Sequence, residues 1–192
     1  MQGFSYFPSI IYRDEKPEFI SNALNVSNGL LAPLENSQPD SLIYQSEPIG
    51  DNPNIYGLSS YIASCSSNIL REQGYNIDQY NLNVILWAQK IKPFAGFDSH
   101  VHKNSILCGF YFLEIDDGGS FPVYDDPRPG RLMSGIEEVN PQEVTAATTK
   151  VFFGNVVPGT LLLSNSYLPH QLTTNHSKKS TKLLHIIVNA WR

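Results

Sequence analysis

The spacing of apolar residues changes along the chain and predicts two kinds of structure. In residues 58–73 apolar side chains recur three and four positions apart, as on one face of a helix. Gly74 follows this segment and can end the helix. The apolar face predicts a helix packed against a sheet, with these inward residues: Leu58, Tyr61, Ile62, Cys65, Ile69 and Leu70.

The first forty residues predict less regular structure. Aromatic and β-branched residues in 4–12 predict a strand, and Pro8 favours an edge position. A short helix is expected to begin near Pro17 and to end at Gly29. Residues 33–56 are rich in Pro and Asn, so they predict irregular structure with one short strand near 42–44.

From residue 82 onward strand patterns dominate. Ile106–Ile115 is apolar on both faces and therefore predicts a central strand. No alternation of strand and helix indicates a parallel sheet, so the fold class expected is mostly β with flanking helices (α+β), an antiparallel sandwich or jelly roll. We expect a single domain, 1–192, with a helical and irregular support region in 1–81 and a jelly-roll core in 82–192. The expected strands are 82–91, 106–115, 120–124, 150–153, 160–164 and 182–191.

Composition narrows the possible functions. Charged residues make up only 16% of the chain and hydrophobic residues 41%, so a folded core is expected. The net charge is −5, and the Lys178-Lys179 pair is too short to indicate nucleic-acid binding. Cys65 and Cys108 give no disulfide framework. Neither a signal peptide nor an apolar run of about 20 residues is present, so a soluble cytoplasmic protein without a membrane span is expected.

The histidines supply the candidate chemistry. His100 and His102 are two positions apart, so both imidazoles leave the same face if this stretch is a strand. His170 follows a proline at the end of another apolar run. These three are the candidate metal ligands. His176 lies in a polar turn and is expected to be an ordinary surface residue, and His185 is expected to be a core or outward-facing strand residue.

Residues 82–191 resemble the 2-oxoglutarate and Fe(II)-dependent oxygenases, in particular a group found in bacteria and phages. The resemblance implies a double-stranded β-helix that uses Fe(II), 2-oxoglutarate and O2. It rests on the motifs His100-Val-His102 before an apolar strand, Gly118-Gly119, Asp125-Asp126-Pro127, Ser166-Tyr-Leu-Pro-His170, and Lys182 and Asn189 in the last strand.

The resemblance also implies roles for individual residues. His100 and His170 are the implied iron ligands, and His102 takes the position usually held by Asp. A site of three neutral imidazoles carries one negative charge fewer than a site of two His and a carboxylate. The site can bind iron, have altered chemistry, or hold another metal such as zinc. Asp98 is an alternative source of the carboxylate, because it shares a face with His100 if the strand continues.

The co-substrate contact is expected from a basic residue. In the family an Arg or Lys after the distal His meets the far carboxylate of 2-oxoglutarate. Lys182 lies twelve residues after His170 and shares a face with Leu184 and Ile186, so it is the candidate. A buried Lys on an apolar face needs an anion. Lys179 is the rival, although its polar turn favours solvation.

The resemblance implies that oxidative decarboxylation of 2-oxoglutarate to succinate and CO2 is coupled to hydroxylation of an unknown small-molecule or protein substrate. The loop 125–145, with Arg128 and Arg131, either covers that substrate or is an ordinary surface loop. Two alternatives stay open. One is a cupin-like three-His metalloprotein that does not use 2-oxoglutarate, and the other is a non-enzymatic phage structural or binding jelly roll. A phage protein would act in the host cytoplasm.

Overall fold

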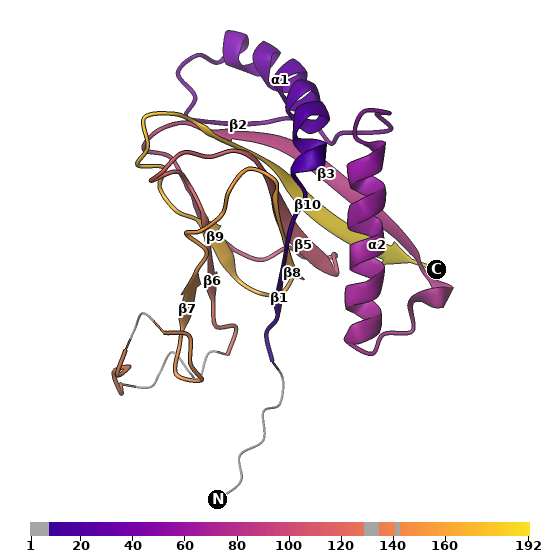
Figure 1. Cartoon of the computed structure of the whole chain (residues 1–192), viewed down its shortest axis with the longest axis vertical. Helices are drawn as coiled ribbons and strands as arrows, with labels where there is room; N and C mark the ends of the chain where they lie inside the picture. Colours follow the sequence, from indigo (N-terminus) through magenta and orange to yellow (C-terminus); the bar gives the residue numbers. More distant parts are fainter. Residues whose placement is uncertain (1–7, 129–134, 141–142) are drawn as a thin grey trace, which may run out of the picture.

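The computed structural model describes residues 8–128, 135–140 and 143–192, which form two antiparallel sheets and two α-helices (Figure 1). The helices are α1 (Ile20–Ser37) and α2 (Tyr56–Glu72), and short 3-10 turns lie at Pro17–Phe19 and Ile77–Gln79. The strands are β1 (Ile11–Glu15), β2 (Ile43–Gln45), β3 (Asn81–Ile91), β4 (Phe97–His100), β5 (Leu107–Glu114), β6 (Pro122–Asp125), β7 (Lys150–Phe152), β8 (Thr160–Asn165), β9 (His170–Leu172) and β10 (Thr181–Trp191).

The larger sheet has the order β1-β8-β5-β10-β3-β2. β10 pairs with β3 along its whole length, from Thr181 opposite Ile91 to Trp191 opposite Asn81. β5 lies between β8 and β10, which confirms the central strand expected from its two apolar faces. The smaller sheet has the order β4-β9-β6-β7, so the histidine-bearing strands β4 and β9 are neighbours.

Two apolar layers lie on opposite faces of the larger sheet. Alternation along β10 separates them, because successive strand side chains point to opposite faces. Leu184 and Ile186 pack with residues of α1 and α2, whereas Leu183 packs with Phe110 and Phe112 on the face toward the smaller sheet. Figure 1 shows the helices on one side of the larger sheet and β6, β7 and β9 on the other. The helix expected over 58–73 is therefore confirmed and packs outside the sheet.

α1 is longer than the sequence pattern predicted. It continues through Gly29 and contains Pro33 in its interior, ending at Ser37. The expected stop at Gly29 and the irregular structure expected from residue 33 are wrong there. Buried Val26 and Leu31 lie on either side of Gly29 and pack into the helix-side core, so tertiary packing outweighs the local preference of Gly and Pro.

The strands of the first 81 residues also differ from expectation. β1 is an edge strand, as Pro8 suggested, but it begins at Ile11, and residues 4–7 of the expected strand lie outside the described residues. β1 and β2 form the two edges of the larger sheet. This part of the chain therefore completes the sheet that carries the core, in addition to supplying its helices.

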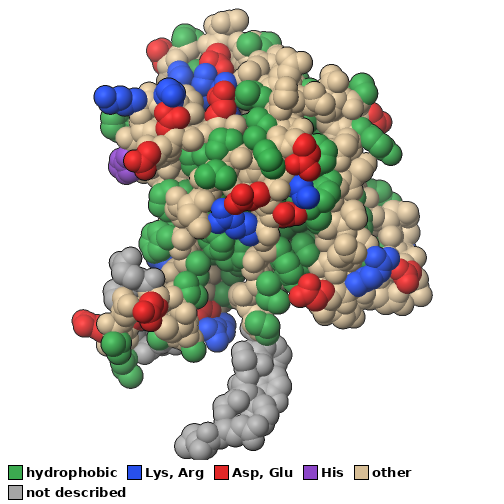
Figure 2. All heavy atoms as spheres, in the orientation of Figure 1, with side chains coloured by type: hydrophobic (Ala, Val, Ile, Leu, Met, Phe, Trp, Pro, Cys, Tyr) green, Lys and Arg blue, Asp and Glu red, His purple; other side chains and the backbone are tan. Residues whose placement is uncertain are grey.

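The exterior carries charges of both signs. Figure 2 shows Lys and Arg interspersed with Asp and Glu on the face it presents, without a single-sign patch. Both cysteines are free, and Cys108 is buried. Within the described ranges no helix has the length and apolarity that a membrane crossing requires.

Candidate metal centre

Three histidines from distant parts of the chain converge at one end of the space between the sheets. One ring nitrogen each of His100, His102 and His170 lies within 4.8 Å of the others. The Nε2 atoms of His102 and His170 are 3.2 Å apart. Two imidazoles bound to one metal at about 2.0–2.1 Å, at roughly right angles, would separate their nitrogens by about 3 Å. The cluster therefore has the spacing of a transition-metal site.

The local backbone explains how the first two histidines reach the cluster. β4 ends at His100, and its pairing with β9 shifts register between Phe97 and His100. His102 lies in the segment after the strand, where its backbone N–H donates to the carbonyl of Ser166 at 3.1 Å. The expectation that one regular strand carries both histidines is therefore wrong, although the two rings still meet, with centroids 4.9 Å apart.

The same register shift excludes Asp98 from the cluster. The sequence placed Asp98 on the face of His100 by strict alternation, but an irregularity between Phe97 and His100 breaks that alternation. Asp98 is exposed, and the metal-site cluster found among the described residues contains three histidines and no carboxylate. The structure thus does not bring Asp98 in to supply the missing negative charge.

Backbone carbonyls orient two of the rings. His100 Nδ1 donates to the carbonyl oxygen of Asp98 at 2.7 Å, and His170 Nδ1 donates to that of Leu168 at 2.9 Å. A carbonyl oxygen can only accept, so both rings carry their proton on Nδ1 when neutral. Nε2 is then left with a free lone pair. Such hydrogen bonds are the usual way in which a protein orients a metal-binding histidine.

Burial keeps His102 and His170 uncharged near neutral pH. Desolvation lowers the pKa of His170 to about 4, and the hydrogen bond to Leu168 only partly opposes this effect. Desolvation, together with the neighbouring histidines, also lowers the pKa of His102 to about 4. Metal binding requires neutral imidazole, so these rings need not lose a proton to accept a cation at pH 7.

A fourth histidine adjoins the cluster and was not among the candidates. His185 Nε2 lies 3.2 Å from His102 Nε2, and the ring stacks on Trp87 with centroids 5.6 Å apart. Burial lowers its pKa to about 3. Alternation places His185 on the face opposite to Leu184 and Ile186, but the sequence alone does not show that this face meets the cluster.

Lys182 lies on the helix-covered face of the larger sheet, opposite to the face that carries His185. Its ammonium group donates to Asn28 Oδ1 of α1 at 2.8 Å and pairs with Glu114 at 3.0 Å. The sequence correctly placed Lys182 on the face of Leu184, but that face is covered by the helices and lies opposite to the histidine cluster. Lys179 pairs with Asp116 and is exposed. Neither lysine is brought to the histidines.

A pocket of about 280 Å³ opens beside the histidine cluster. It has an apolar wall and a few polar groups, which is typical of small-molecule sites. Its described lining contains neither Lys nor Arg. The lining residues are Gln45, Trp87, Gln89, Phe97, His100, His102, Phe110, Leu172, His185 and Ile187.

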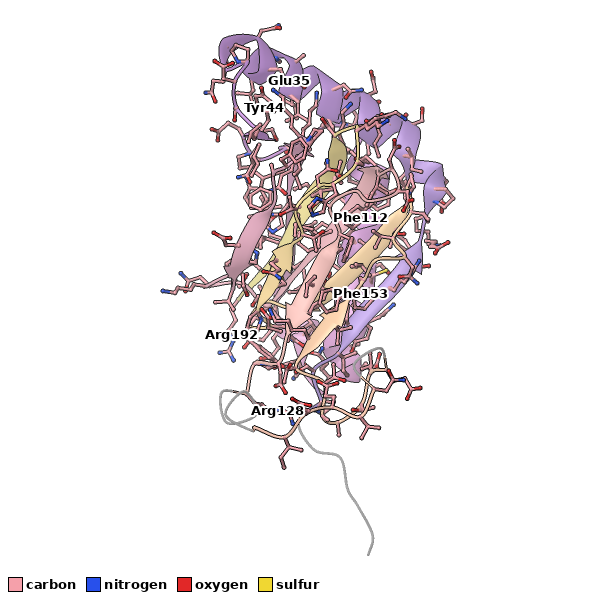
Figure 3. The ribbon with its side chains drawn as sticks, turned by 90° about the vertical axis from the view of Figure 1, so that its left-hand side faces the viewer. Glu35, Tyr44, Phe112, Arg128, Phe153 and Arg192 are labelled. Carbon is pink, nitrogen blue, oxygen red and sulfur yellow. The ribbon has the colours of Figure 1, made fainter. Side chains whose placement is uncertain are left out.

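The loop expected to cover a substrate is only partly described. Arg128 forms a two-pronged hydrogen-bonded ion pair with Asp126, and it does not line the histidine pocket. Figure 3 shows Arg128 at one end of the molecule, opposite to Glu35 and Tyr44. Arg131 lies outside the described residues.

A comparison with protein families assigns the chain. Residues 85–182 match the model described as "Putative 2OG-Fe(II) oxygenase". This segment begins in β3, spans the histidine cluster and ends in β10, and it covers about half of the chain. The chain belongs to the 2OG-Fe(II) oxygenase family. A comparison with curated protein sequences finds no match.

Solved structures with the same fold agree with this assignment. A prolyl-4-hydroxylase from Pseudomonas putida is 11% identical with a TM-score of 0.60, covering 94% of this chain and 92% of that one. The epimerase SnoN in complex with Fe³⁺, α-ketoglutarate and nogalamycin RO is 10% identical with a TM-score of 0.65, covering 94% and 79%. EvdO2 from Micromonospora carbonacea, complexed with 2-oxoglutarate, is 11% identical with a TM-score of 0.55, covering 94% and 86%.

The family fixes the fold and the cofactors. This 2OG-Fe(II) oxygenase has the double-stranded β-helix fold, and its cofactors are Fe(II) and 2-oxoglutarate, with O2 as the second co-substrate. The three histidines fit the metal, because each can offer a ring nitrogen to a divalent transition metal. The donor set differs from two histidines and a carboxylate in its charge and in having a nitrogen in place of one oxygen donor.

Proposed function

We propose that His100, His102 and His170 hold the catalytic Fe(II) of this oxygenase through their ring nitrogens. The observation that carries the proposal is the convergence of three rings, two of which are fixed by Nδ1 hydrogen bonds that leave Nε2 free. His185 adjoins the cluster through His102. In this proposal it is a neighbour of the metal centre and not a ligand.

The surrounding residues hold the ligands in place and exclude water. Phe110 packs against both His170 and His185, with ring centroids 5.7 Å away in each case. His170 is fully buried and His100 is exposed, so the cluster has one dry side and one open side. A substrate can approach only from the open side. When bound there, Fe(II) and 2-oxoglutarate would activate O2, and O2 would supply the oxidising chemistry that a protein side chain lacks.

We further propose that this chemistry hydroxylates an unactivated C–H bond of a small molecule or a protein segment. The pocket beside the histidines is small, so the substrate would meet the metal at the open side of the cluster. A cytoplasmic site of action is consistent with two free cysteines and with a ferrous cofactor.

The test combines metal analysis with turnover. The protein purified without metal is loaded anaerobically with Fe(II), and its bound iron is counted. We expect one iron per chain, and we expect uncoupled conversion of 2-oxoglutarate to succinate after O2 is admitted. His170→Ala should abolish both. Iron binding that survives the loss of His170 would contradict the proposed ligand set.

A second candidate function has a specific observation in its favour. The cluster lacks a carboxylate, and the described lining of the pocket lacks a cation. Both features are compatible with a three-His metalloprotein that does not turn over 2-oxoglutarate. Stoichiometric metal binding without succinate formation, and without any 2-oxoglutarate-dependent absorbance, would favour this alternative.

A further inference from the structure

We propose that 2-oxoglutarate lies in the pocket beside the histidines and that its distal carboxylate is bound by the side-chain amides of Gln45 and Gln89, without a basic residue. The inference rests on the proposed function, because it takes the Fe(II) site at the histidine cluster as given. It assigns a carboxylate-binding subsite to two neutral residues, one on the edge strand β2 and one on its neighbour β3.

The two glutamines form a pair across neighbouring strands. Gln45 of β2 is directly opposite Gln89 of β3 in the strand register. Gln89 Nε2 donates to Gln45 Oε1 at 2.6 Å. Gln89 is only 5% exposed, whereas Gln45 is exposed at the edge strand. Both line the pocket that also contains His100 and His102. The amide pair and the histidine cluster therefore share one cavity.

The side-chain amides of Gln45 and Gln89 have N–H donors that are not used in the bond between them. Each glutamine carries two amide hydrogens. Within the described part of the chain, Gln89 Nε2 donates one hydrogen bond and Gln45 Nε2 donates none. The remaining N–H groups can donate to a carboxylate in the pocket. Hydrogen bonds to an ionised acceptor are stronger than those between neutral groups.

Lys90 and Lys182 are both engaged on the helix-covered face of the larger sheet. Lys90, the residue after Gln89, pairs with Glu35 of α1 at 2.6 Å. Lys182 pairs with Glu114 and bonds Asn28 on the same helix-covered face. Alternation sends the side chains of Lys90 and Gln89 to opposite faces of the sheet. A cation cannot reach the distal carboxylate from these positions without a change of strand register.

Apolar side chains occupy the space nearer to the start of β10. Leu183, Phe112 and Leu162 are all fully buried there and pack together. A carboxylate placed among them would be desolvated without a partner, which is costly. The polar end of the pocket at Gln45 and Gln89 is therefore the favourable place for the distal carboxylate of a 2-oxoglutarate whose other end binds the metal.

The charge of the site makes a neutral anchor sufficient. Fe(II) bound by three neutral imidazoles keeps its full charge of +2, and 2-oxoglutarate brings −2, so the complex is already neutral overall. A carboxylate ligand would have removed one positive charge and created a need for an added cation. Without a carboxylate among the metal ligands, the bound complex has no excess negative charge, so no basic residue is needed to balance it.

The test compares two ligands that differ only at the distal end. 2-Oxovalerate has the same 2-oxo acid group as 2-oxoglutarate but a methyl group in place of the distal carboxylate. Binding to the anaerobic Fe(II) protein is measured by the charge-transfer absorbance and by the fluorescence of Trp87, which lines the pocket. Trp191→Phe makes Trp87 the only tryptophan.

We expect Gln89→Leu to weaken 2-oxoglutarate binding roughly tenfold or more, the effect of losing a hydrogen bond to a charged group. Binding of 2-oxovalerate and the iron content should change less than twofold. Gln45→Leu should act in the same direction, and Gln89→Glu should abolish 2-oxoglutarate binding by charge repulsion while iron is retained. Lys182→Met is the control and should leave the affinity for 2-oxoglutarate unchanged.

The outcomes separate the inference from the function on which it rests. If Lys182→Met weakens 2-oxoglutarate binding and Gln89→Leu does not, the amide anchor is overturned and the oxygenase assignment stands. If Gln89→Leu weakens both ligands equally, the glutamine supports the pocket and does not bind the distal carboxylate. If the parent binds iron but neither ligand, the proposed use of 2-oxoglutarate fails, and the inference fails with it.

Discussion

The Nε2 atoms of His102 and His185 lie 3.2 Å apart, although 83 positions separate the two residues in the chain. His102 Nε2 is equally close to His170 Nε2. His102 is therefore the shared neighbour of the proposed metal ligand His170 and of the additional histidine. Substitutions at His102, His170 and His185 can therefore distinguish the proposed metal ligands from their neighbour.

Replacing either His102 or His170 by Ala should remove iron binding, because two remaining imidazoles hold a divalent metal poorly. His185→Gln should keep close to one iron per chain, since His185 is not a proposed ligand. Iron per chain, counted after anaerobic loading and desalting, checks this. Loss of iron from His185→Gln, with the fold intact by circular dichroism, would show that the centre uses four histidines.

The stability of the metal-free protein should fall as the pH is lowered from about 6.5 toward 4. Burial lowers the pKa of His102 and of His170 to about 4, and that of His185 to about 3, from an ordinary value of 6.5. Between these values the unfolded chain binds protons that the folded chain does not. Acidification therefore favours unfolding, and the pH dependence from these groups fades about one unit above the ordinary value of 6.5.

Urea denaturation of the metal-free protein at several pH values measures this effect. His185→Gln removes one of the three groups, so its free energy of unfolding should depend less steeply on pH over the same interval. A free energy of unfolding that stays constant or rises between pH 6.5 and 4 would contradict neutral, buried histidines in the folded state.

Gly109→Ala should strongly destabilise the protein. A Cβ atom at Gly109 would lie 1.9 Å from the carbonyl oxygen of Leu162 in the adjacent strand β8. That atom belongs to a paired backbone and cannot move without opening the centre of the sheet. We expect a loss of about 3 kcal/mol or more, above the typical cost of overpacking of about 1–3 kcal/mol, because the clash is with paired backbone. Thermal and urea denaturation would detect it.

Gly29→Ala is the matched control for that substitution. Gly29 lies inside α1, and a Cβ atom there would meet nothing within 4 Å. The alanine should therefore stabilise the protein by about 0.5–1 kcal/mol, because glycine is unfavourable inside a helix. A clear loss of stability at position 29 would mean that α1 does not continue through this residue.

Ile62→Ala should lower the free energy of unfolding by about 2–5 kcal/mol, as other truncations of large buried side chains do. Ile62 is 0% exposed and lies on the face of α2 that packs onto the larger sheet. Ile136→Ala makes the same chemical change at a position that is 83% exposed, and it should cost little. Equal effects at both positions would contradict the packing of α2 on the sheet.

The sequence by itself determined the elements whose pattern is local and periodic. The apolar face of residues 58–73 defined α2. The two apolar faces of 106–115 placed β5 in the middle of a sheet, because a strand that is covered by a layer on each face is typical of the interior of a sheet. Spacing and turn context also singled out His100, His102 and His170, which the structure brings together.

Only the tertiary structure decided which face of the sheet each residue meets. Alternation put Lys182 with Leu184 and Ile186, but it did not say whether helices or the second sheet cover that face. The register shift in β4 that turns Asp98 away is likewise invisible to a period of two. Local sequence fixes the relative directions of side chains, whereas long-range packing fixes what lies on each side. The site depends on both, and His185 and Gln89 entered it only through the second.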